Sequence, residues 1–263
     1  MTTVHDILTH LETLAPGYMK MDWDNVGLLC GSRRSAVTKV LVALDPFEGV
    51  CREAKDFGAE LILTHHPLIF HPVKAVTDET SLGRAIQLLC ENHISAINAH
   101  TNLDCAPGGV NDRLAVVLGL QNITVIDPMG TDEHGRQWGL LRQGTVKEQS
   151  LADFLHTVKS SLHCEGLRYV DGGKPVHRVA VGGGACAGEL QDAVKAGCDT
   201  FVTSDIKYNQ FWDARDLGLN LIDAGHFYTE NPIIAYLAEE IAATFPDLEV
   251  KISETHADCM KFY

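Results

Sequence analysis

Short apolar segments that alternate with helix-length amphipathic segments constrain the fold of this chain more than any other feature. Residues 39–44 (KVLVAL), 60–64 (ELILT) and 94–99 (ISAINA) are typical of buried strands. A proline-initiated segment at 46–57 and a second segment at 81–93 separate them and predict helices. Strands joined through helices of this length pair in parallel through right-handed crossovers, so we expect a parallel α/β sheet.

The remainder of the chain continues this alternation after a less regular middle. Residues 128–135 (PMGTDEHG) are rich in turn-forming residues and predict a loop at a domain junction. At the N-terminus, apolar residues recur at helical spacing behind Thr3 and Asp6, which predicts a capped amphipathic helix. Further strands are expected at 122–126, 137–144, 176–183, 200–204 and 219–223, and further helices at 150–162, 188–197, 207–218 and from about 231 to 244.

An internal repeat relates the two parts of the chain. At an offset of 139 residues, the segment 58–66 (GAELILTHH) aligns with 197–205 (GCDTFVTSD). At a reduced offset of 126, the His-x-x-x-Asp of 97–104 corresponds to the His-x-x-x-Glu of 221–230. Two related α/β halves explain this match, and common α/β patterning is the alternative explanation. The alignment places Gly58 on Gly197, Ala54 on Ala193, Glu60 on Asp199 and Thr64 on Thr203.

The length and composition allow two modest domains with substantial cores, because 45% of the 263 residues are apolar. We expect an α/β fold of two similar, pseudo-symmetric halves with mixed, mostly parallel sheets. The first half is predicted to comprise residues 1–126 with part of the C-terminal segment, and the second half residues 127–263.

Histidines follow three of the expected strands. His65 and His66 end the strand at 60–64, His100 follows 94–99, and His226 follows 219–223. Ligands of open parallel sheets collect beyond the carboxyl ends of strands, so these side chains are placed where a site would form. Asp104 lies four residues after His100, and Glu230 lies four residues after His226.

The adjacent pair His65 and His66 favours two metals over one. Successive side chains of an extended segment point to opposite faces, and Pro67 biases His66 toward an extended conformation. Each imidazole can then bind a different metal of a pair that is bridged by a carboxylate, as in two-metal hydrolytic sites. Imidazole with carboxylate suits zinc, manganese, iron or nickel rather than calcium.

Simpler explanations exist for each motif taken alone. A lone histidine at a strand end is usually a hydrogen-bonding loop residue, and His-x-x-x-Asp pairs often form solvated caps. Three such clusters at strand ends, two of them related by the repeat, favour a metal site. The glycine segment 181–185 (VGGGA) lacks a phosphate-loop motif and predicts a tight turn, and Cys105 and His71 are expected to be packing and loop residues.

Charge and cysteine content exclude some classes of function. The net charge of −14 and the pI near 5.3 make a nucleic-acid surface unfavourable, because such surfaces need clustered lysine and arginine. The eight cysteines show no C-x-x-C pairs, which is typical of reduced core cysteines. With no signal-peptide pattern and no apolar run approaching the roughly 20 residues that span a bilayer, we expect a cytoplasmic protein without membrane contact.

Five motifs together resemble a known family. DNVGLLCG, LILTHHPLIF, NAHTNLDCAPGGVND, TSDIKY and DAGHFYTE occur in the order found in the GTP cyclohydrolase 1 type 2 homologues, also called NIF-three-like dinuclear-metal proteins. The resemblance covers nearly the whole chain. It implies two similar α/β domains, assembled into a toroidal homohexamer with metal sites facing the inner cavity.

The resemblance also implies roles for individual residues. Two divalent metal ions per chain (zinc, iron, manganese or nickel) are expected on His65, His66, Asp104, His226 and Glu230, with Glu230 and Asp104 as bridges. His100 is expected to be a further ligand or a catalytic proton-transfer group. The family name suggests GTP or a related nucleotide as the small-molecule substrate. Lys74 and Lys207 are candidates to meet its phosphates, and Asn25 is a candidate to line the cleft.

Two functional classes follow from this sequence. The first is a metal-dependent hydrolase of the GTP cyclohydrolase kind, in which two metals activate a water molecule. The second is a non-catalytic metal-binding scaffold or adaptor, in which a ring assembly presents a partner surface. DNA threading through such a ring is disfavoured by the acidic composition.

Overall fold

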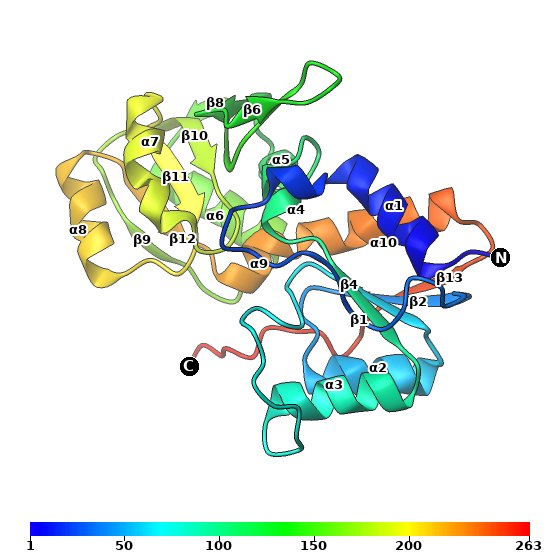
Figure 1. Cartoon of the computed structure of the whole chain (residues 1–263). Helices are drawn as coiled ribbons and strands as arrows, with labels where there is room; N and C mark the ends of the chain where they lie inside the picture. The colour runs from blue at the N-terminus through cyan, green and yellow to red at the C-terminus, as the bar shows by residue number, and fades with distance from the viewer. The chain divides into compact units, whose positions relative to one another are not determined.

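The computed structural model describes residues 1–263, which divide into two compact units (Figure 1). Unit 1 comprises Met1–Leu103 and Ile234–Ala257, and unit 2 comprises Asp104–Ile233 and Asp258–Tyr263. The chain thus leaves unit 1 within helix α4 (Thr101–Cys105) and returns to it within helix α10 (Pro232–Thr244). This division lies earlier in the chain than the boundary at residue 126 that the sequence suggested.

A five-stranded sheet forms the centre of unit 1. Its strand order is β1-β4-β3-β2-β13, with β2, β3, β4 and β13 parallel and β1 antiparallel at the edge. The inner parallel strands β2, β3 and β4 are short and apolar at their centres because helices cover both faces of the sheet. The strands span Gly27–Cys30 (β1), Lys39–Ala43 (β2), Leu61–Thr64 (β3), Ser95–Asn98 (β4) and Glu249–Ile252 (β13).

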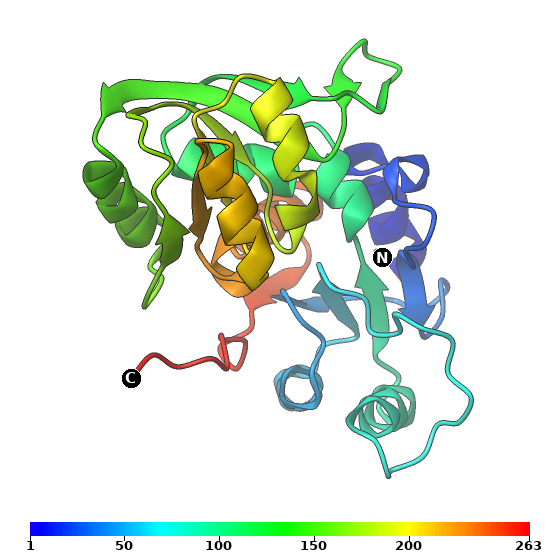
Figure 2. The ribbon, with the colours of Figure 1, turned by 90° about the vertical axis from the view of Figure 1, so that its left-hand side faces the viewer.

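Alternate side chains of the unit 1 strands face different helices. Leu41, Ile62 and Ala96 pack on one face against α2 (Glu48–Phe57) and α3 (Ser81–Glu91). These two helices lie side by side below the sheet, and Figure 2 shows both nearly end-on. The opposite face is covered by α1 (Val4–Leu14) and α10, as Figure 1 shows, and both helices bury an apolar stripe. A short 3₁₀ helix, η1 (Gly17–Met19), follows α1.

A six-stranded sheet forms the centre of unit 2. Its order is β5-β8-β10-β11-β12-β9, in which β10, β11 and β12 are parallel and the remaining neighbours are antiparallel. A separate hairpin pairs β6 with β7. The strands span Gln121–Ile126 (β5), Gly130–Thr131 (β6), Gln137–Trp138 (β7), Leu141–Gln149 (β8), Arg168–Val170 (β9), Val176–Val181 (β10), Thr200–Thr203 (β11) and Asn220–Asp223 (β12).

Helices cover both faces of the unit 2 sheet as well. Val179, Val202 and Ile222 face one core with α5 (Val110–Val117) and α6 (Leu151–Leu162). Their sequence neighbours Ala180, Phe201 and Leu221 face a second core with α7 (Leu190–Lys195) and α8 (Tyr208–Asp216). This strict alternation is the period of two that a strand imposes. Two short helices, η2 (Cys186–Glu189) and α9 (His226–Glu230), complete the unit.

The structure confirms the expected fold class, a mixed α/β architecture with two similar halves. In each half three consecutive parallel strands alternate with helices, and the parallel strands lie inside the sheet. The expected single strand at 137–144 is divided, because Gly139 donates its backbone N–H to the carbonyl of Cys105 instead of continuing the ladder. The segment 128–135, expected at a domain junction, lies in the β6–β7 hairpin of unit 2. None of the helices has the length and apolar character needed to cross a membrane.

Candidate metal centre

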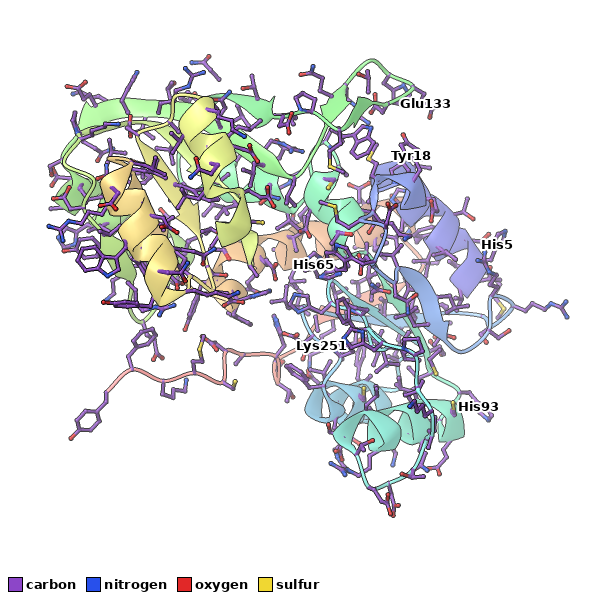
Figure 3. All side chains as sticks on the ribbon, turned by 60° about the vertical axis from the view of Figure 1, so that its left-hand side comes forward. His5, Tyr18, His65, His93, Glu133 and Lys251 are labelled. Carbon is purple, nitrogen blue, oxygen red and sulfur yellow. The ribbon has the colours of Figure 1, made fainter.

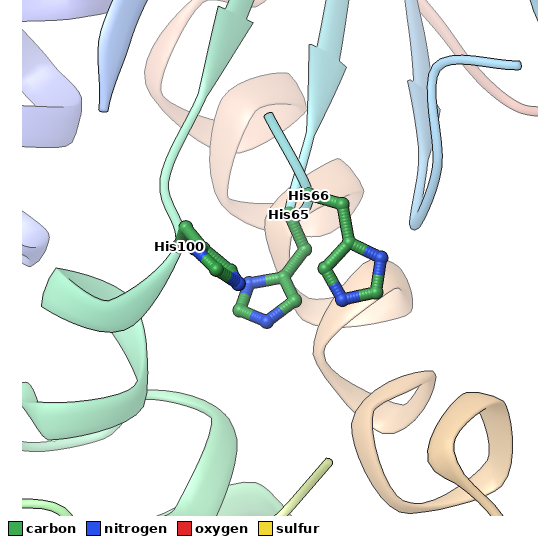
Figure 4. A group of neighbouring side chains, drawn as sticks. All are labelled: His65, His66 and His100. Carbon is green, nitrogen blue, oxygen red and sulfur yellow. The ribbon is translucent and has the colours of Figure 1, made fainter. Parts of the chain in front are cut away.

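Three histidines gather at the carboxyl ends of two neighbouring strands of unit 1. His65 and His66 follow β3 directly, and His100 lies two residues after β4, which pairs with β3 in parallel. The ring centroids are 5.0 Å apart for His65 and His66, 5.2 Å for His65 and His100, and 5.5 Å for His66 and His100. Figure 4 shows the three rings together beyond the strand ends. One ring nitrogen of each lies within 4.8 Å of those of the other two, so the cluster could hold a metal ion.

Each of these rings is oriented through its Nδ1 atom. His65 Nδ1 lies 2.8 Å from the backbone oxygen of Ala99, and His66 Nδ1 lies 2.6 Å from Oδ1 of Asp45. An oxygen acceptor at Nδ1 selects the tautomer that carries its proton there, which leaves Nε2 as the metal-binding atom. Histidine ligands of protein metal sites are commonly held in this way.

Asp24 holds the third histidine. Its Oδ1 atom lies 2.8 Å from Nδ1 of His100, and its Oδ2 atom accepts hydrogen bonds from the backbone N–H (3.0 Å) and the hydroxyl (2.5 Å) of Thr101. Burial raises the pKa of the Asp24 carboxyl, but the hydrogen bonds from His100 and Thr101 outweigh burial and hold the pKa far below its usual range. Asp24 is therefore a permanent carboxylate that fixes the His100 ring.

Unit 2 presents one histidine between two acids. His226 opens helix α9, with its Nδ1 atom 2.7 Å from Oδ2 of Asp205 and its Nε2 atom 3.1 Å from Oε2 of Glu230. Burial lowers the pKa of the His226 imidazole, but the hydrogen bonds and charges of the two acids raise it to about 11. The hydrogen bond from His226 lowers the pKa of Asp205. The two acids therefore strongly favour a positive charge at Nε2 of His226.

A glycine turn packs directly on Glu230. A Cβ atom at Gly184 would lie 2.1 Å from Oε1 of Glu230 and 3.1 Å from Nε2 of His226, and Gly184 has a φ of +64°. The amides of this turn are used inside the protein, since Gly183 donates to Asn111 (2.6 Å) and Gly184 donates to Thr229 (3.0 Å). The segment 181–185 is therefore a tight turn that shapes the carboxylate site and not a phosphate cradle.

Asp104 is a second buried acid of unit 2. Its side chain and that of Glu230 both raise the pKa of the Cys186 thiol, which burial raises first. Both carboxylates therefore act on the same small region of the unit. Cys105, the alternative thiolate ligand, is fully buried, and its backbone oxygen accepts a hydrogen bond from Arg142 (3.1 Å). That position is typical of a packing residue.

The candidate substrate-binding residues differ in their surroundings. The side-chain amide of Asn25 donates to the backbone oxygen of Ile69 at 2.6 Å, so it ties two loops of unit 1 together. Lys74 is exposed in the segment between β3 and α3. Lys207 is exposed in unit 2, where its backbone N–H donates to the Gln210 side chain at the start of α8. In Figure 3, His65 lies among packed side chains, whereas His93 is an exposed histidine.

Sequence reasoning missed three residues that contact or surround the histidines. Asp45 and Asp205 each lie two residues after a buried strand. A single acid at such a position is typical of a turn or a helix cap, so this pattern alone offered no reason to assign it to a site. His256 follows β13, and the charges of His66 and Asp45 influence its pKa. Burial lowers its pKa, and Asp45 opposes this shift. The signal for Asp205 was present, because the repeat aligns Asp205 with His66.

The donor atoms fit divalent transition metals. Unit 1 holds a group of three imidazoles, and unit 2 holds one imidazole with the carboxylates of Asp104 and Glu230. Mixed nitrogen and oxygen donors of this kind suit zinc, iron, manganese or nickel, and they do not suit calcium.

Comparison with known proteins finds similar chains over almost the whole length of this one. Residues 2–259 match the family described as Duf34/NIF3 (NGG1p interacting factor 3). A curated relative from Clostridium perfringens, the "GTP cyclohydrolase 1 type 2 homolog", is 36% identical over 98% of this chain and 99% of its own length. The crystal structure of the Staphylococcus aureus hypothetical protein SA1388 has a TM-score of 0.90 at 31% identity over 99% of both chains. A Bacillus cereus protein related to NIF3 has a TM-score of 0.90 at 28% identity over 100% of this chain and 99% of that one.

Proposed function

The chain belongs to the Duf34/NIF3 family, and on that premise we propose that it is a metal-dependent hydrolase that acts on a nucleotide-like substrate. Two divalent metals would be held by His65, His66, Asp104, His226 and Glu230. The observation that carries the proposal is the common orientation of four histidines. His65, His66, His100 and His226 each place Nδ1 on an oxygen acceptor, which leaves Nε2 to bind a metal or, in His100, to accept a proton.

The two donor sets complement one another chemically. The cluster of unit 1 is made of imidazoles, which carry no negative charge with which to neutralise a pair of dications. Asp104 and Glu230 of unit 2 supply negative charge, and a carboxylate has two oxygens with which to bridge two metals. We therefore assign both sets to one dinuclear centre.

When bound, such a pair of metals lowers the pKa of a water molecule toward neutrality and polarises an electrophilic carbon or phosphorus. The protein's own groups orient the reactants and move protons. His100 is assigned as the proton acceptor, because Asp24 fixes its ring and stabilises the imidazolium that proton uptake would create. His65 is fully buried, so its part is to bind and orient rather than to exchange protons with solvent.

The substrate and assembly follow from the relatives as proposals. Several curated relatives carry the name GTP cyclohydrolase 1 type 2 homolog, so GTP is the first substrate to test. Hydrolysis of its guanine ring would release formate. A toroidal homohexamer is the assembly that the family resemblance implies, and light scattering of the purified protein checks it.

The test of catalysis compares Glu230→Ala with Glu239→Ala. Glu239 is an exposed glutamate of helix α10, so its removal controls for the loss of one acid from the surface. Wild type and Glu239→Ala are expected to release formate from GTP at equal rates, and Glu230→Ala is expected to lose this activity. Equal turnover in wild type and Glu230→Ala would contradict the proposal.

A double-mutant cycle tests whether the donors serve one centre. Metal affinity is measured for His65→Ala, Glu230→Ala and the double variant. Groups that act on the same ions give strongly non-additive losses, whereas independent sites give additive ones. Additive losses would separate the two clusters and remove the dinuclear assignment.

A further inference from the structure

A cavity of about 340 Å³ lies within unit 1, beside the histidine cluster. Its size is in the range of small-molecule pockets. The loop after β2, the segment after β3 and the start of α3 form its walls. Most of this lining is apolar or aromatic, and includes Pro46, Phe47, Leu68, Phe70 and Leu82.

The cavity is continuous with the candidate metal centre through its residues. His66 lines the cavity and is also a member of the three-histidine cluster. Asp45, which orients His66, is a second lining residue. The ring of Phe70 lies 6.1 Å from that of His100. A small molecule in this cavity would therefore lie against His66 of the centre and against Asp45, the acid that orients it.

The lining contains aromatic faces that are open to a ligand. Phe47 is 67% exposed and Phe70 is 39% exposed, although large apolar side chains are usually buried. Trp23 extends this aromatic surface, with its ring 5.8 Å from that of Phe70. Exposed aromatic rings that surround a cavity are suited to stacking against a planar ring.

The polar groups of the lining indicate which charge a bound ring can carry. The carboxylates of Asp45 and Glu48 line the cavity, and neither lysine nor arginine is a lining residue. Glu48 is already paired with Arg84 (2.8 Å) and with Arg52. An anionic phosphate finds no cationic partner here. A neutral ring whose N–H groups can donate to carboxylate or carbonyl oxygen matches the lining.

We propose that this cavity binds a planar heteroaromatic ring of the nucleobase type and holds it against His66. The inference rests on the proposed function, because it identifies the part of the substrate that is recognised next to the metals. Phosphates of a nucleotide would lie outside the cavity.

The test measures guanosine binding to the metal-loaded, full-length protein by isothermal titration calorimetry. Guanosine carries the ring without phosphate, so its binding measures recognition of the ring separately from any contact with phosphate. Phe47→Ser removes one aromatic wall at the N-cap of α2, where serine is a favoured residue, so the variant is expected to fold. Ser81→Trp is a second variant, which fills the cavity from the exposed start of α3.

Both variants are expected to weaken guanosine binding about ten-fold or more. Tyr208→Ser is the matched control, because Tyr208 is an exposed aromatic residue at the start of α8 in unit 2. It should bind guanosine like wild type. Inorganic phosphate should not compete with guanosine.

Two results would overturn the assignment of the cavity. One is guanosine affinity that is equal in wild type, Phe47→Ser and Ser81→Trp, or undetectable in all three. The other is loss of bound metal in Phe47→Ser, since weaker guanosine binding would then follow from damage to the centre. Failure of the hydrolase proposal is a separate result, because formate release and the effect of Glu230→Ala do not enter this measurement.

Discussion

The ends of β3 and β4 in unit 1 and the ends of β11 and β12 in unit 2 are repeat-related, yet they carry different chemistry. His65 and His66 correspond to Ser204 and Asp205, and His100 corresponds to His226. The first set is a group of three imidazoles. The second set is one imidazole held between two carboxylates. The two halves thus share the positions of these residues and differ in the donor atoms found there.

This difference shows how the orienting acids were supplied. In unit 2 the residue equivalent to His66 is Asp205, which itself orients His226. In unit 1 that position is occupied by a histidine, so the orienting acids come from elsewhere, namely Asp45 after β2 and Asp24 before β1. Equivalent positions in the two halves therefore carry residues of the candidate site. The residue type at each position determines whether its side chain can bind a metal or orients a neighbouring histidine.

The first prediction compares His65 with its repeat partner Ser204. His65→Ala should weaken metal binding by more than the roughly 10–100-fold that loss of an outer hydrogen-bond partner typically causes, because an inner ligand is removed. Ser204→Ala should leave metal content unchanged, since Ser204 is not a proposed ligand. Its buried hydroxyl has no hydrogen-bond partner, so its removal should not destabilise the fold. The test measures the amount of metal bound per chain by elemental mass spectrometry, at a series of buffered free-metal concentrations, for wild type and both variants. Similar loss in both variants would break the comparison.

The second prediction separates the orienting acids of the two units. Asp24→Asn should cost about 1–3 kcal/mol of stability, because a fully buried carboxylate that accepts four hydrogen bonds is lost. Asp205→Asn should change stability by no more than about 0.5 kcal/mol, since this side chain is 49% exposed. Asp205→Asn should weaken metal binding roughly 10–100-fold, because Asp205 orients the proposed ligand His226. Asp24 orients the proton acceptor His100, so Asp24→Asn should leave metal affinity nearly unchanged. Urea denaturation and metal titration measure the two effects, and a large stability loss in Asp205→Asn would contradict the distinction.

The third prediction concerns β13, the edge strand of the unit 1 sheet, which comes from the C-terminal part of the chain and has no counterpart in unit 2. Glu53 of α2 holds the chain after β13 by accepting hydrogen bonds from Ser253 Oγ (2.5 Å) and from the backbone N–H groups of Glu254 (2.9 Å) and Thr255 (3.0 Å). Burial raises the pKa of Glu53, and these bonds lower it to about 2, from an ordinary value of 4.5. Because the pKa of Glu53 is lower in the folded than in the unfolded state, the ionised Glu53 carboxylate stabilises the fold above pH 4.5. This contribution is lost as the pH falls toward 2.

Glu53→Gln should therefore cost on the order of 2 kcal/mol at neutral pH and flatten the decline in stability between pH 4.5 and pH 2. Its repeat partner Asp192 is the control, because Asp192 is partly exposed and its side chain interacts only with the exposed Lys195 and the neighbouring Glu189. Asp192→Asn should change neither stability nor its pH dependence measurably. Thermal unfolding followed by circular dichroism across this pH range tests both variants. An unchanged acid slope in Glu53→Gln would remove the anchoring role.

The sequence predicted the parallel strands and the histidine cluster because both follow from local pattern. ELILT and TFVTS are apolar on both faces, and the structure has strands at Leu61–Thr64 and Thr200–Thr203. Neighbouring parallel strands end at one edge of a sheet, so histidines after β3 and β4 were expected to meet. Their positions in unit 1 agree with that expectation.

Long-range pairing accounts for what the sequence did not predict. Strand β13 pairs with β2 across some two hundred residues, and its alternating, partly charged sequence gives little sign of a sheet edge. His256 follows β13 and was therefore missed. The division of 137–144 depends on Arg142, whose buried guanidinium donates to the backbone oxygens of Gly139 (2.6 Å) and Ala106 (3.0 Å). A single buried arginine does not reveal such partners in advance.

The smallest predicted effect tests the repeat itself, at two glycines that end equivalent helices. Gly58 follows α2 with φ +77° and Gly197 follows the α7 helix with φ +78°, and neither has a close neighbour at its Cβ position. The next residue of each turn donates to an equivalent carbonyl, Ala59 to Ala54 at 2.9 Å and Cys198 to Ala193 at 3.1 Å. Gly58→Ala and Gly197→Ala should therefore each cost about 1 kcal/mol in urea denaturation, from left-handed backbone strain alone. Gly188→Ala, which meets no neighbour and has no positive φ, should cost nothing. Unequal losses at Gly58 and Gly197 would show that the two turns, despite their shared geometry, are not equivalent in energy.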